Sequence, residues 1–181
     1  MAYIGFIFYE KSPRFIGELA PEFVKDITGL KKVGVFVNES EERILNCVSV
    51  YGLDHVQLHG NESVDDARRI TRPVWKALTL ESPIDAWPAD IMVLLDAHDP
   101  DRKGGTGRTI DWRRAADVAA QRRVILAGGL KPENVGEAVA SVRPHGIDVS
   151  SGVEREPGIK DVARLTALFE AVHGSHHQTR S

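Results

Sequence analysis

Cysteine is nearly absent from the sequence, with Cys47 as the single one among 181 residues. One thiol cannot form an internal disulfide, which excludes a disulfide-stabilised scaffold and allows a reducing compartment. Long apolar runs are also missing: the longest span about five or six residues, whereas a transmembrane helix needs about 20. The first residues lack the charged, apolar, small-residue order of a signal peptide. Together these absences predict a cytoplasmic protein.

Neither sign of charge dominates, because 23 Lys and Arg face 26 Asp and Glu, for a net charge of -3. This balance offers no electrostatic basis for binding nucleic acid or an anionic membrane, so we expect neither as a partner. With 42% hydrophobic and 27% charged residues, the chain has the composition of a globular protein with a sizeable core. We predict one domain over residues 1–173 and a polar, disordered tail over 174–181.

Short apolar runs alternate with amphipathic segments along the whole chain. The predicted strands are 3–8, 32–37, 55–58, 74–77, 91–95, 124–127 and 147–149. The predicted helices are 18–28, 40–51, 63–70, 111–120, 133–142 and 161–173, with 79–89 as the weakest candidate. Several strands are apolar at every position, which is typical of parallel strands covered on both faces. Seven βα repeats without a linker therefore predict one α/β domain.

Three helix starts carry recognisable signals. Ser40 and Ser63 each come shortly before a pair of acidic residues, as N-cap residues often do. Pro132 is expected at the first position of the helix that follows it.

The positions of the glycines distinguish an open doubly wound sheet from a closed barrel. An open sheet usually binds its ligand on a glycine-rich turn after the first strand, but here that strand is followed by "YEKSPR". The glycines follow the last three strands instead, in "GGTG", "AGG" and "DVSSG". Barrels typically hold phosphate with the loops after strands 7 and 8. The sequence therefore favours a TIM (β/α)8 barrel.

The first candidate site residues stand at the ends of predicted strands. Asp96 ends the apolar run "IMVLL", where burial can raise a carboxyl pKa toward the working range of a general acid. The structural alternative for Asp96 is a helix N-cap or an ion pair with Arg102 or Lys103. Backbone N–H groups of glycine-rich turns can bind phosphate oxygens, although a lone glycine pair is more often a tight turn. The phosphate-binding candidates in these turns are Gly128, Gly129, Ser150, Ser151 and Gly152.

Three other polar side chains follow or occupy strands. Arg14 in "KSPR" is either a solvated surface charge or a planar fork for a carboxylate. His59 ends the strand in "QLHG" and is as compatible with a structural role as with a catalytic one. Asp148 lies within a short predicted strand, from which it would point into a barrel or toward a ligand.

Six segments, in order along the chain, resemble phosphoribosylanthranilate isomerase of tryptophan biosynthesis. They are "GFIFYEKSPR", "VGVFVNES", "VQLHGNES", "LLDAHDPDRKGGTGRTIDW", "ILAGGLKPENV" and "DVSSGVEREPGIKD", and the match runs from about Tyr3 to Phe169. The resemblance implies a (β/α)8 barrel that needs no metal or redox cofactor. It also implies an Amadori rearrangement of the small phosphosugar N-(5-phosphoribosyl)anthranilate to 1-(2-carboxyphenylamino)-1-deoxyribulose 5-phosphate.

The resemblance also implies roles for the candidate residues. Asp96 matches the general acid that protonates the ribose ring oxygen, and Arg14 matches the arginine that faces the anthranilate moiety. His59 and Asp148 match polar residues near that pocket. The "GGTG" loop, which contains Gly105, matches the phosphate-holding end together with the "AGG" and "SSG" turns.

The family's first strand, roughly Lys-Ile-Cys-Gly, and its helix have no counterpart before Tyr3. We therefore expect a barrel of seven βα units whose exposed strand edges could associate with other chains. The cysteine of that strand is the family's general base. Cys47 is predicted instead to be a core thiol within a helix, so we expect no general-base cysteine and little activity from this chain. The alternative is a non-catalytic phosphosugar-binding protein that keeps the phosphate loops.

Overall fold

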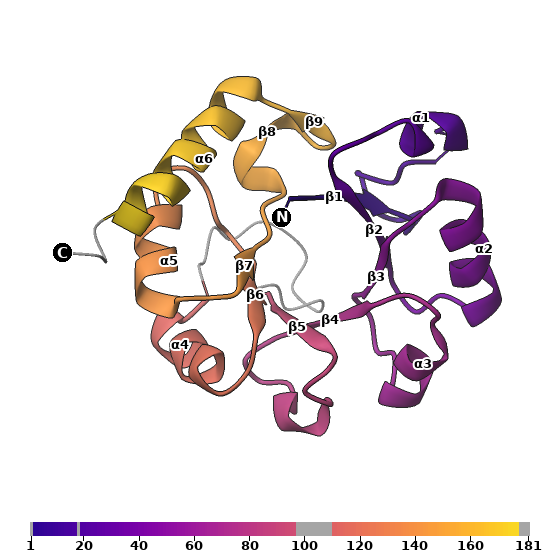
Figure 1. Cartoon of the computed structure of the whole chain (residues 1–181), viewed down its shortest axis with the longest axis horizontal. Helices are drawn as coiled ribbons and strands as arrows, with labels where there is room; N and C mark the ends of the chain where they lie inside the picture. Colours follow the sequence, from indigo (N-terminus) through magenta and orange to yellow (C-terminus); the bar gives the residue numbers. More distant parts are fainter. Residues whose placement is uncertain (1, 18, 97–109, 178–181) are drawn as a thin grey trace. The chain divides into compact units, whose positions relative to one another are not determined.

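The computed structural model describes residues 2–17, 19–96 and 110–177. The chain divides into two compact units, each containing strands and helices (Figure 1). Unit 1 comprises Met1–Ala77 and Asp85–Met92, and unit 2 comprises Leu78–Ile84 and Val93–Ser181. The strands are parallel and follow the order of the sequence within each unit. The predicted α/β fold built on parallel strands is confirmed.

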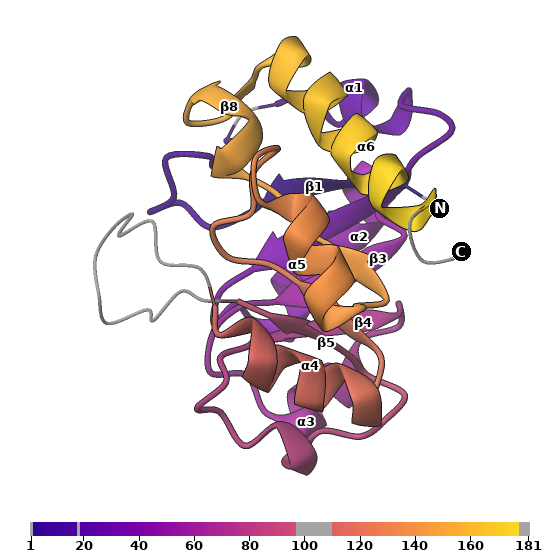
Figure 2. The same cartoon turned by 90° about the vertical axis from the view of Figure 1, so that its left-hand side faces the viewer.

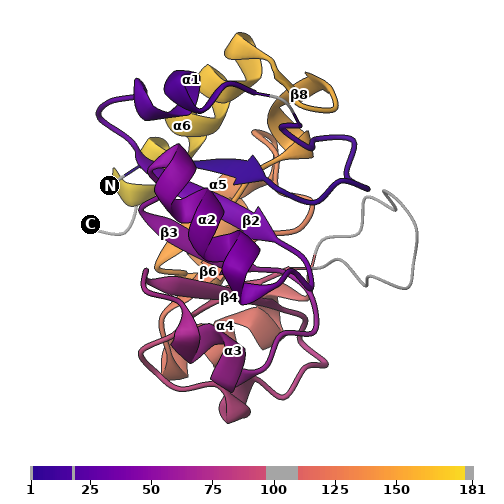
Figure 3. The same ribbon diagram turned by 90° about the vertical axis from the view of Figure 1, so that its right-hand side faces the viewer.

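Unit 1 contains parallel strands in the order β1-β2-β3-β4, with helices in the connections (Figure 3). The strands are β1 (Tyr3–Ile7), β2 (Lys31–Phe36), β3 (His55–Leu58) and β4 (Val74–Leu78). The helices are α1 (Pro21–Lys25), α2 (Glu41–Tyr51) and α3 (Val64–Arg69). The register aligns Val35 with Gln57 and Gln57 with Trp75. Gln57 therefore occupies a position between two neighbouring strands.

The two predicted serine N-caps begin α2 and α3. The Ser40 hydroxyl accepts a hydrogen bond from the Arg43 N–H at 3.3 Å, and Ser63 forms a capping box with Asp66. These bonds satisfy backbone donors that the first helical turn leaves without a partner inside the helix. Cys47 lies on the buried face of α2, which confirms the predicted core thiol.

Unit 2 contains the parallel strands β5, β6 and β7, with helices beside them (Figure 2). The strands are β5 (Met92–Leu95), β6 (Val124–Leu126) and β7 (Gly146–Ile147). The helices are α4 (Trp112–Gln121), α5 (Val135–Val142) and α6 (Val162–His177), and a 3-10 helix, η2, spans Ser151–Val153. Val93, Leu95, Val124 and Leu126 are fully buried in one cluster. Helices α4 and α5 add Ala115 and Ala138 to this core, so strands that are apolar at every position are covered by packing.

Several predicted boundaries were wrong. The predicted helix 18–28 shortens to α1, and the segment 79–89 contains only the 3-10 helix η1 (Ile84–Ala86). Helix α5 begins at Val135 rather than Pro132, because Pro132 belongs to a turn closed by hydrogen bonds to Asn134. Helix α6 continues to His177, beyond the predicted end at residue 173. A short antiparallel hairpin, β8 (Glu154–Glu156) and β9 (Ile159–Lys160), was not predicted at all.

Candidate active site

In unit 2, three backbone hydrogen bonds align the carboxyl ends of the strands. Asp96 donates from its N–H to the Leu78 carbonyl at 2.9 Å, and Ala127 donates to Leu95 at 2.8 Å. Asp148 donates to Leu126 at 2.8 Å and lies just past β7, not within it as predicted. The Asp96 side chain is half-buried, whereas Asp148 is exposed. The structure thus places Asp96 and Asp148 at the same end of one parallel sheet.

The turn after β6 takes its shape from two glycines and one asparagine. Gly128 and Gly129 have φ values of 82° and 66°, in the left-handed region that favours glycine. The Asn134 side chain accepts from the Lys131 N–H at 2.9 Å and donates to the Gly129 carbonyl at 3.0 Å. Asn134 therefore fixes the turn itself, in addition to standing at the start of α5.

The turn after β7 packs directly against the turn after β6. A Cβ atom at Gly152 would collide with the carbonyl oxygen of Leu130 and lie 3.1 Å from the Cα of Lys131. The neighbouring Ser150 carbonyl accepts a hydrogen bond from Lys160 Nζ at 3.0 Å, and the same amine pairs with Glu154 at 3.0 Å. The two turns singled out in the sequence thus meet backbone to backbone.

In unit 1, Arg14 lies beside the carboxyl end of β1. The Ser12 side chain accepts from the Arg14 N–H at 3.1 Å, and Ile16 donates to the Ile7 carbonyl at 3.0 Å. Phe15 forms a bridge with Ile7, so the "KSPR" turn folds back along the strand that precedes it. The Arg14 side chain is half-buried, which distinguishes it from a fully solvated surface charge.

His59 follows β3 and is held from two directions. Its N–H donates to the Phe36 carbonyl at 2.8 Å, which ties it to the end of β2. Its ring Nδ1 lies 3.0 Å from Nε2 of Gln57, whose side chain is buried. Both the backbone and the ring of His59 therefore have defined partners.

A buried ion pair connects Lys76 in the middle of β4 to the loops that follow β2 and β3. Lys76 Nζ lies 2.8 Å from the Glu62 carboxylate and 2.5 Å from the Gly60 carbonyl oxygen. Glu62 also accepts from the N–H groups of Asn38 at 2.7 Å and Gly60 at 2.9 Å. Burial raises the pKa of Glu62, but the hydrogen bonds and charge of Lys76 outweigh burial and hold this pKa below its usual value.

Sequence reasoning missed this ion pair, although one signal was present. A lysine in the middle of the strand "VWKAL" should be paired if the strand is buried, because an unpaired buried charge is costly. The Lys76 side chain is only 2% exposed, and its Nζ lies 5.6 Å from the ring centroid of Trp87.

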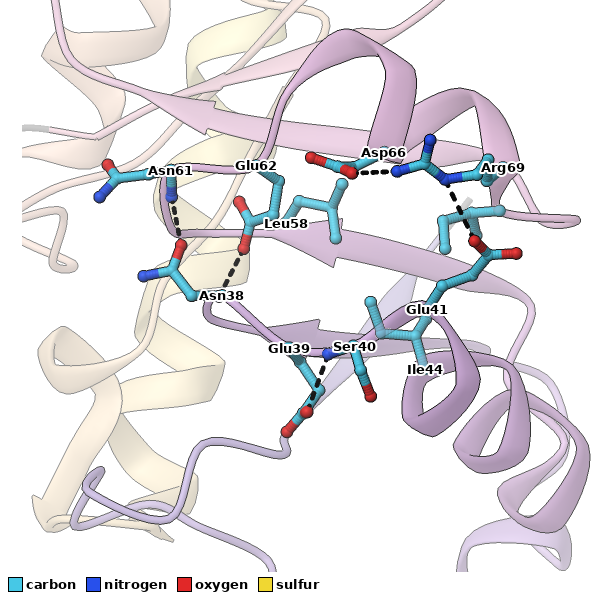
Figure 4. A pocket seen from close by; sticks show the side chains of 11 residues that line it. Asn38, Glu39, Ser40, Glu41, Ile44, Leu58, Asn61, Glu62, Asp66 and Arg69 are labelled. Carbon is cyan, nitrogen blue, oxygen red and sulfur yellow. Dashed lines mark hydrogen bonds and ion pairs between the residues drawn. The ribbon is translucent and has the colours of Figure 1, made fainter.

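A hollow of about 310 Å³ lies next to Glu62, between the first turns of α2 and α3 (Figure 4). Acidic side chains line it, but Arg69 bridges Asp66 and Glu41 across it (Figure 4).

In the described ranges, no group of three or more His, Cys, Asp or Glu side chains is placed to hold a metal ion. No helix among these residues is both long and apolar enough to cross a membrane. Gly105, predicted from the "GGTG" loop, lies outside the described residues.

Known proteins are similar to this chain in sequence and in fold over most of its length. The family described as N-(5'phosphoribosyl)anthranilate (PRA) isomerase matches residues 1–171. The N-(5'-phosphoribosyl)anthranilate isomerase of Hahella chejuensis is 42% identical over 178 residues, which cover 94% of this chain and 83% of that protein. The enzyme of Citrifermentans bemidjiense is 43% identical over 172 residues, with 92% and 84% covered.

Solved structures agree with the sequence comparison. The phosphoribosyl anthranilate isomerase from Thermotoga maritima superposes with a TM-score of 0.86 at 38% identity, covering 95% of this chain and 88% of that chain. A complex of such an isomerase with reduced 1-(o-carboxyphenylamino)-1-deoxyribulose 5-phosphate gives a TM-score of 0.82 at 36% identity, with 95% and 87% covered. With matched segments that include the strand ends carrying Arg14, His59 and Asp96, the chain belongs to the N-(5'-phosphoribosyl)anthranilate isomerase family.

Proposed function

We propose that the chain isomerises N-(5'-phosphoribosyl)anthranilate to 1-(2-carboxyphenylamino)-1-deoxyribulose 5-phosphate. The observation that carries the proposal is the arrangement in unit 2, where the half-buried Asp96 shares a strand edge with two interlocked glycine turns. Relatives about 40% identical over about 90% of the chain carry the name of this isomerase.

In this proposal Asp96 acts as the general acid. The carboxylic acid gives its proton to the ribose ring oxygen as the bond from this oxygen to C1′ breaks, and the nitrogen lone pair then forms the C1′ iminium. The C2′ proton then passes to solvent water, its C–H electron pair forms the C1′–C2′ double bond of the enol-amine, and uptake of a proton at C1′ gives the ketone. Positioned acids of this kind contribute about 10²- to 10⁴-fold to a rate. The position at the end of an apolar strand supports this role.

Cys47 is not assigned the removal of the C2′ proton. It is buried within α2, and burial raises the pKa of its thiol, with a smaller raising effect from Glu39 and an opposing one from Arg43. A thiol must ionise to act as a base, so a raised pKa disfavours the role.

We assign the phosphate to the interlocked turns. The left-handed glycines and the close approach at Gly152 bring the backbones of the two turns together, and backbone N–H groups are good phosphate ligands. The proposed phosphate residues are Gly128, Gly129, Ser150, Ser151 and Gly152, together with Gly105 from the sequence. Arg14 is proposed to bind the anthranilate carboxylate, because guanidinium groups match carboxylates in shape and charge.

The (β/α)8 barrel of the family is the architecture that we propose for these strands and helices. The TM-score of 0.86 to the Thermotoga maritima isomerase supports it.

A non-catalytic phosphosugar-binding protein is the second candidate function. The observation in its favour is that the two glycine turns are built from backbone and Asn134, independently of Asp96. Exchange of the C2′ proton with solvent, followed by mass spectrometry on labelled substrate, separates the two functions. An isomerase converts and exchanges its substrate, and Asp96→Asn should slow both by about 100-fold or more. Tight binding of the reduced product analogue without exchange by the unsubstituted chain would favour the binding protein.

A further inference from the structure

Gln57 is a buried polar residue that the function described above does not use. It is 5% exposed, and its neighbours along β3, Val56 and Leu58, are fully buried apolar residues. Burying an amide costs free energy unless it forms hydrogen bonds. An amide at this position therefore calls for a partner, and the ring of His59 supplies one.

The orientation of the Gln57 amide toward His59 favours one position for the ring proton. Gln57 Nε2 is an amide nitrogen, which can only donate, so Nδ1 of His59 at 3.0 Å must accept. A neutral imidazole that accepts at Nδ1 carries its hydrogen on Nε2. The alternation of side chains along a strand places residues 57 and 59 on the same face, so the contact follows from strand geometry.

The backbone around His59 is fixed independently of its ring. The His59 N–H is bonded to Phe36, and the next residue, Gly60, is held by Glu62 through its N–H and by Lys76 through its carbonyl. The Glu62 and Lys76 side chains are 5% and 2% exposed, so water does not compete with their bonds. Because the backbone is held in place, the hydrogen bond that Gln57 donates favours a single tautomer of the ring.

We propose that Gln57 is a positioning residue that holds His59 in the Nε2–H tautomer, so that His59 acts as a hydrogen-bond donor to an oxygen of the bound substrate. This inference rests on the proposed function, because a phosphosugar substrate with a carboxylate and hydroxyl groups supplies such oxygen acceptors. A histidine of fixed tautomer donates without reorganising when the substrate arrives, which is how preorganised sites gain binding and rate.

The test compares the full chain with two variants of similar side-chain volume. Gln57→Met removes the donor, and Gln57→Glu replaces it with a carboxylate, which can only accept. We expect Gln57→Glu to draw the hydrogen to Nδ1 and leave Nε2 as an acceptor. The ¹⁵N and ¹³C shifts of the imidazole, with His59 assigned through His59→Asn, report the tautomer directly. His55 on the same strand is the internal control, and its signals should keep their tautomer pattern in both variants.

We expect the unsubstituted chain to show the Nε2–H form, Gln57→Met a mixture, and Gln57→Glu the Nδ1–H form. In turnover, Gln57→Glu should lower kcat/KM by about 10-fold or more and Gln57→Met by less, which is the scale of one hydrogen bond. An Nδ1–H form in the unsubstituted chain would overturn the inference, and so would unchanged kcat/KM in Gln57→Glu. The spectra need no turnover, so an inactive chain that shows the Nε2–H form would count against the proposed function alone.

Discussion

Unit 1 and unit 2 hold the loops at their strand ends with different kinds of interaction. In unit 1 the carboxylate of Glu62 and the amine of Lys76 collect backbone groups from Asn38 and Gly60, and all of these bonds are made by side chains. In unit 2 the backbone conformation of Gly128 and Gly129 and the approach of Gly152 to Leu130 shape the turns, and the side chains of Asn134 and Lys160 add hydrogen bonds to the Gly129 and Ser150 carbonyls. The unit 1 arrangement depends on a buried ion pair, whereas the unit 2 turns also require the absence of a Cβ at position 152.

This difference matches what each loop presents. The unit 1 loops carry Arg14 and His59, whose side chains we propose as substrate contacts, so the backbone that supports them must be held in place. We propose that the unit 2 turns bind phosphate through their backbone N–H groups. Large side chains at these turns would cover the surface that a phosphate would use. The two arrangements should therefore respond differently to substitution and to pH.

The largest effect is expected from breaking the buried ion pair. Lys76→Met leaves the Glu62 carboxylate buried without its cation, and losing one partner of a buried pair typically costs about 3–5 kcal/mol. Urea unfolding monitored by circular dichroism measures the loss. The matched control is Lys31→Met, which breaks the exposed Lys31–Asp54 pair at 2.7 Å and should cost less than about 1 kcal/mol. Equal losses of unfolding free energy in the two variants would show that the buried pair contributes no more to stability than the exposed one.

Asp96→Asn should lower kcat by at least about 100-fold, equivalent to about 2.7 kcal/mol of barrier, with little change in KM. The amide cannot give up a proton, whereas the turns that we assign to phosphate are unchanged. Steady-state turnover measures both constants. Asp117→Asn, an exposed aspartate on α4, is the control and should behave like the unsubstituted chain. Full activity in Asp96→Asn would show that this carboxylate is only structural.

Gly152→Ala tests the backbone packing of unit 2. The added Cβ would collide with the Leu130 carbonyl, so one turn must move, at a cost of about 1–3 kcal/mol as in other overpacked sites. Because both turns are assigned to phosphate, KM should rise about 5-fold or more. Gly146→Ala in β7 is the control, because its Cβ would meet only the Ile125 side chain at 3.8 Å. Similar KM values for both variants would mean that the contact at Gly152 does not shape the phosphate site.

The smallest effect is a pH dependence of stability that comes from Glu62 in unit 1. The pKa of Glu62 is lower in the folded chain than in the unfolded one, so its contribution is present above about pH 4.3 and is lost as pH falls through the folded pKa. The difference in unfolding free energy between the unsubstituted chain and Glu62→Gln should therefore shrink as the pH falls below about 4.3. Gly152→Ala should show no such trend. A constant difference for Glu62→Gln would contradict the lowered pKa.

The sequence by itself determined the features that depend on neighbouring residues. Ser40 and Ser63 cap helices because a hydroxyl reaches an N–H only three residues away. Cys47 is a core thiol because its position in a 3.6-residue period places it with Ile44 and Val48. The glycine pair after β6 marked a turn because glycine adopts positive φ at little cost.

Only the tertiary structure decided the contacts that join distant segments. Glu62 and Asn38 are 24 residues apart, Glu62 and Lys76 are 14 apart, and Gly152 meets Leu130 across two loops. These contacts depend on the register of parallel strands, which aligns residues separated by a whole helix and which local patterns do not specify. Asn134 shows what the sequence could not predict. Its position indicated a helix start, but its side-chain hydrogen bonds to Lys131 and Gly129 form because the folded turn brings the backbone of these residues within reach.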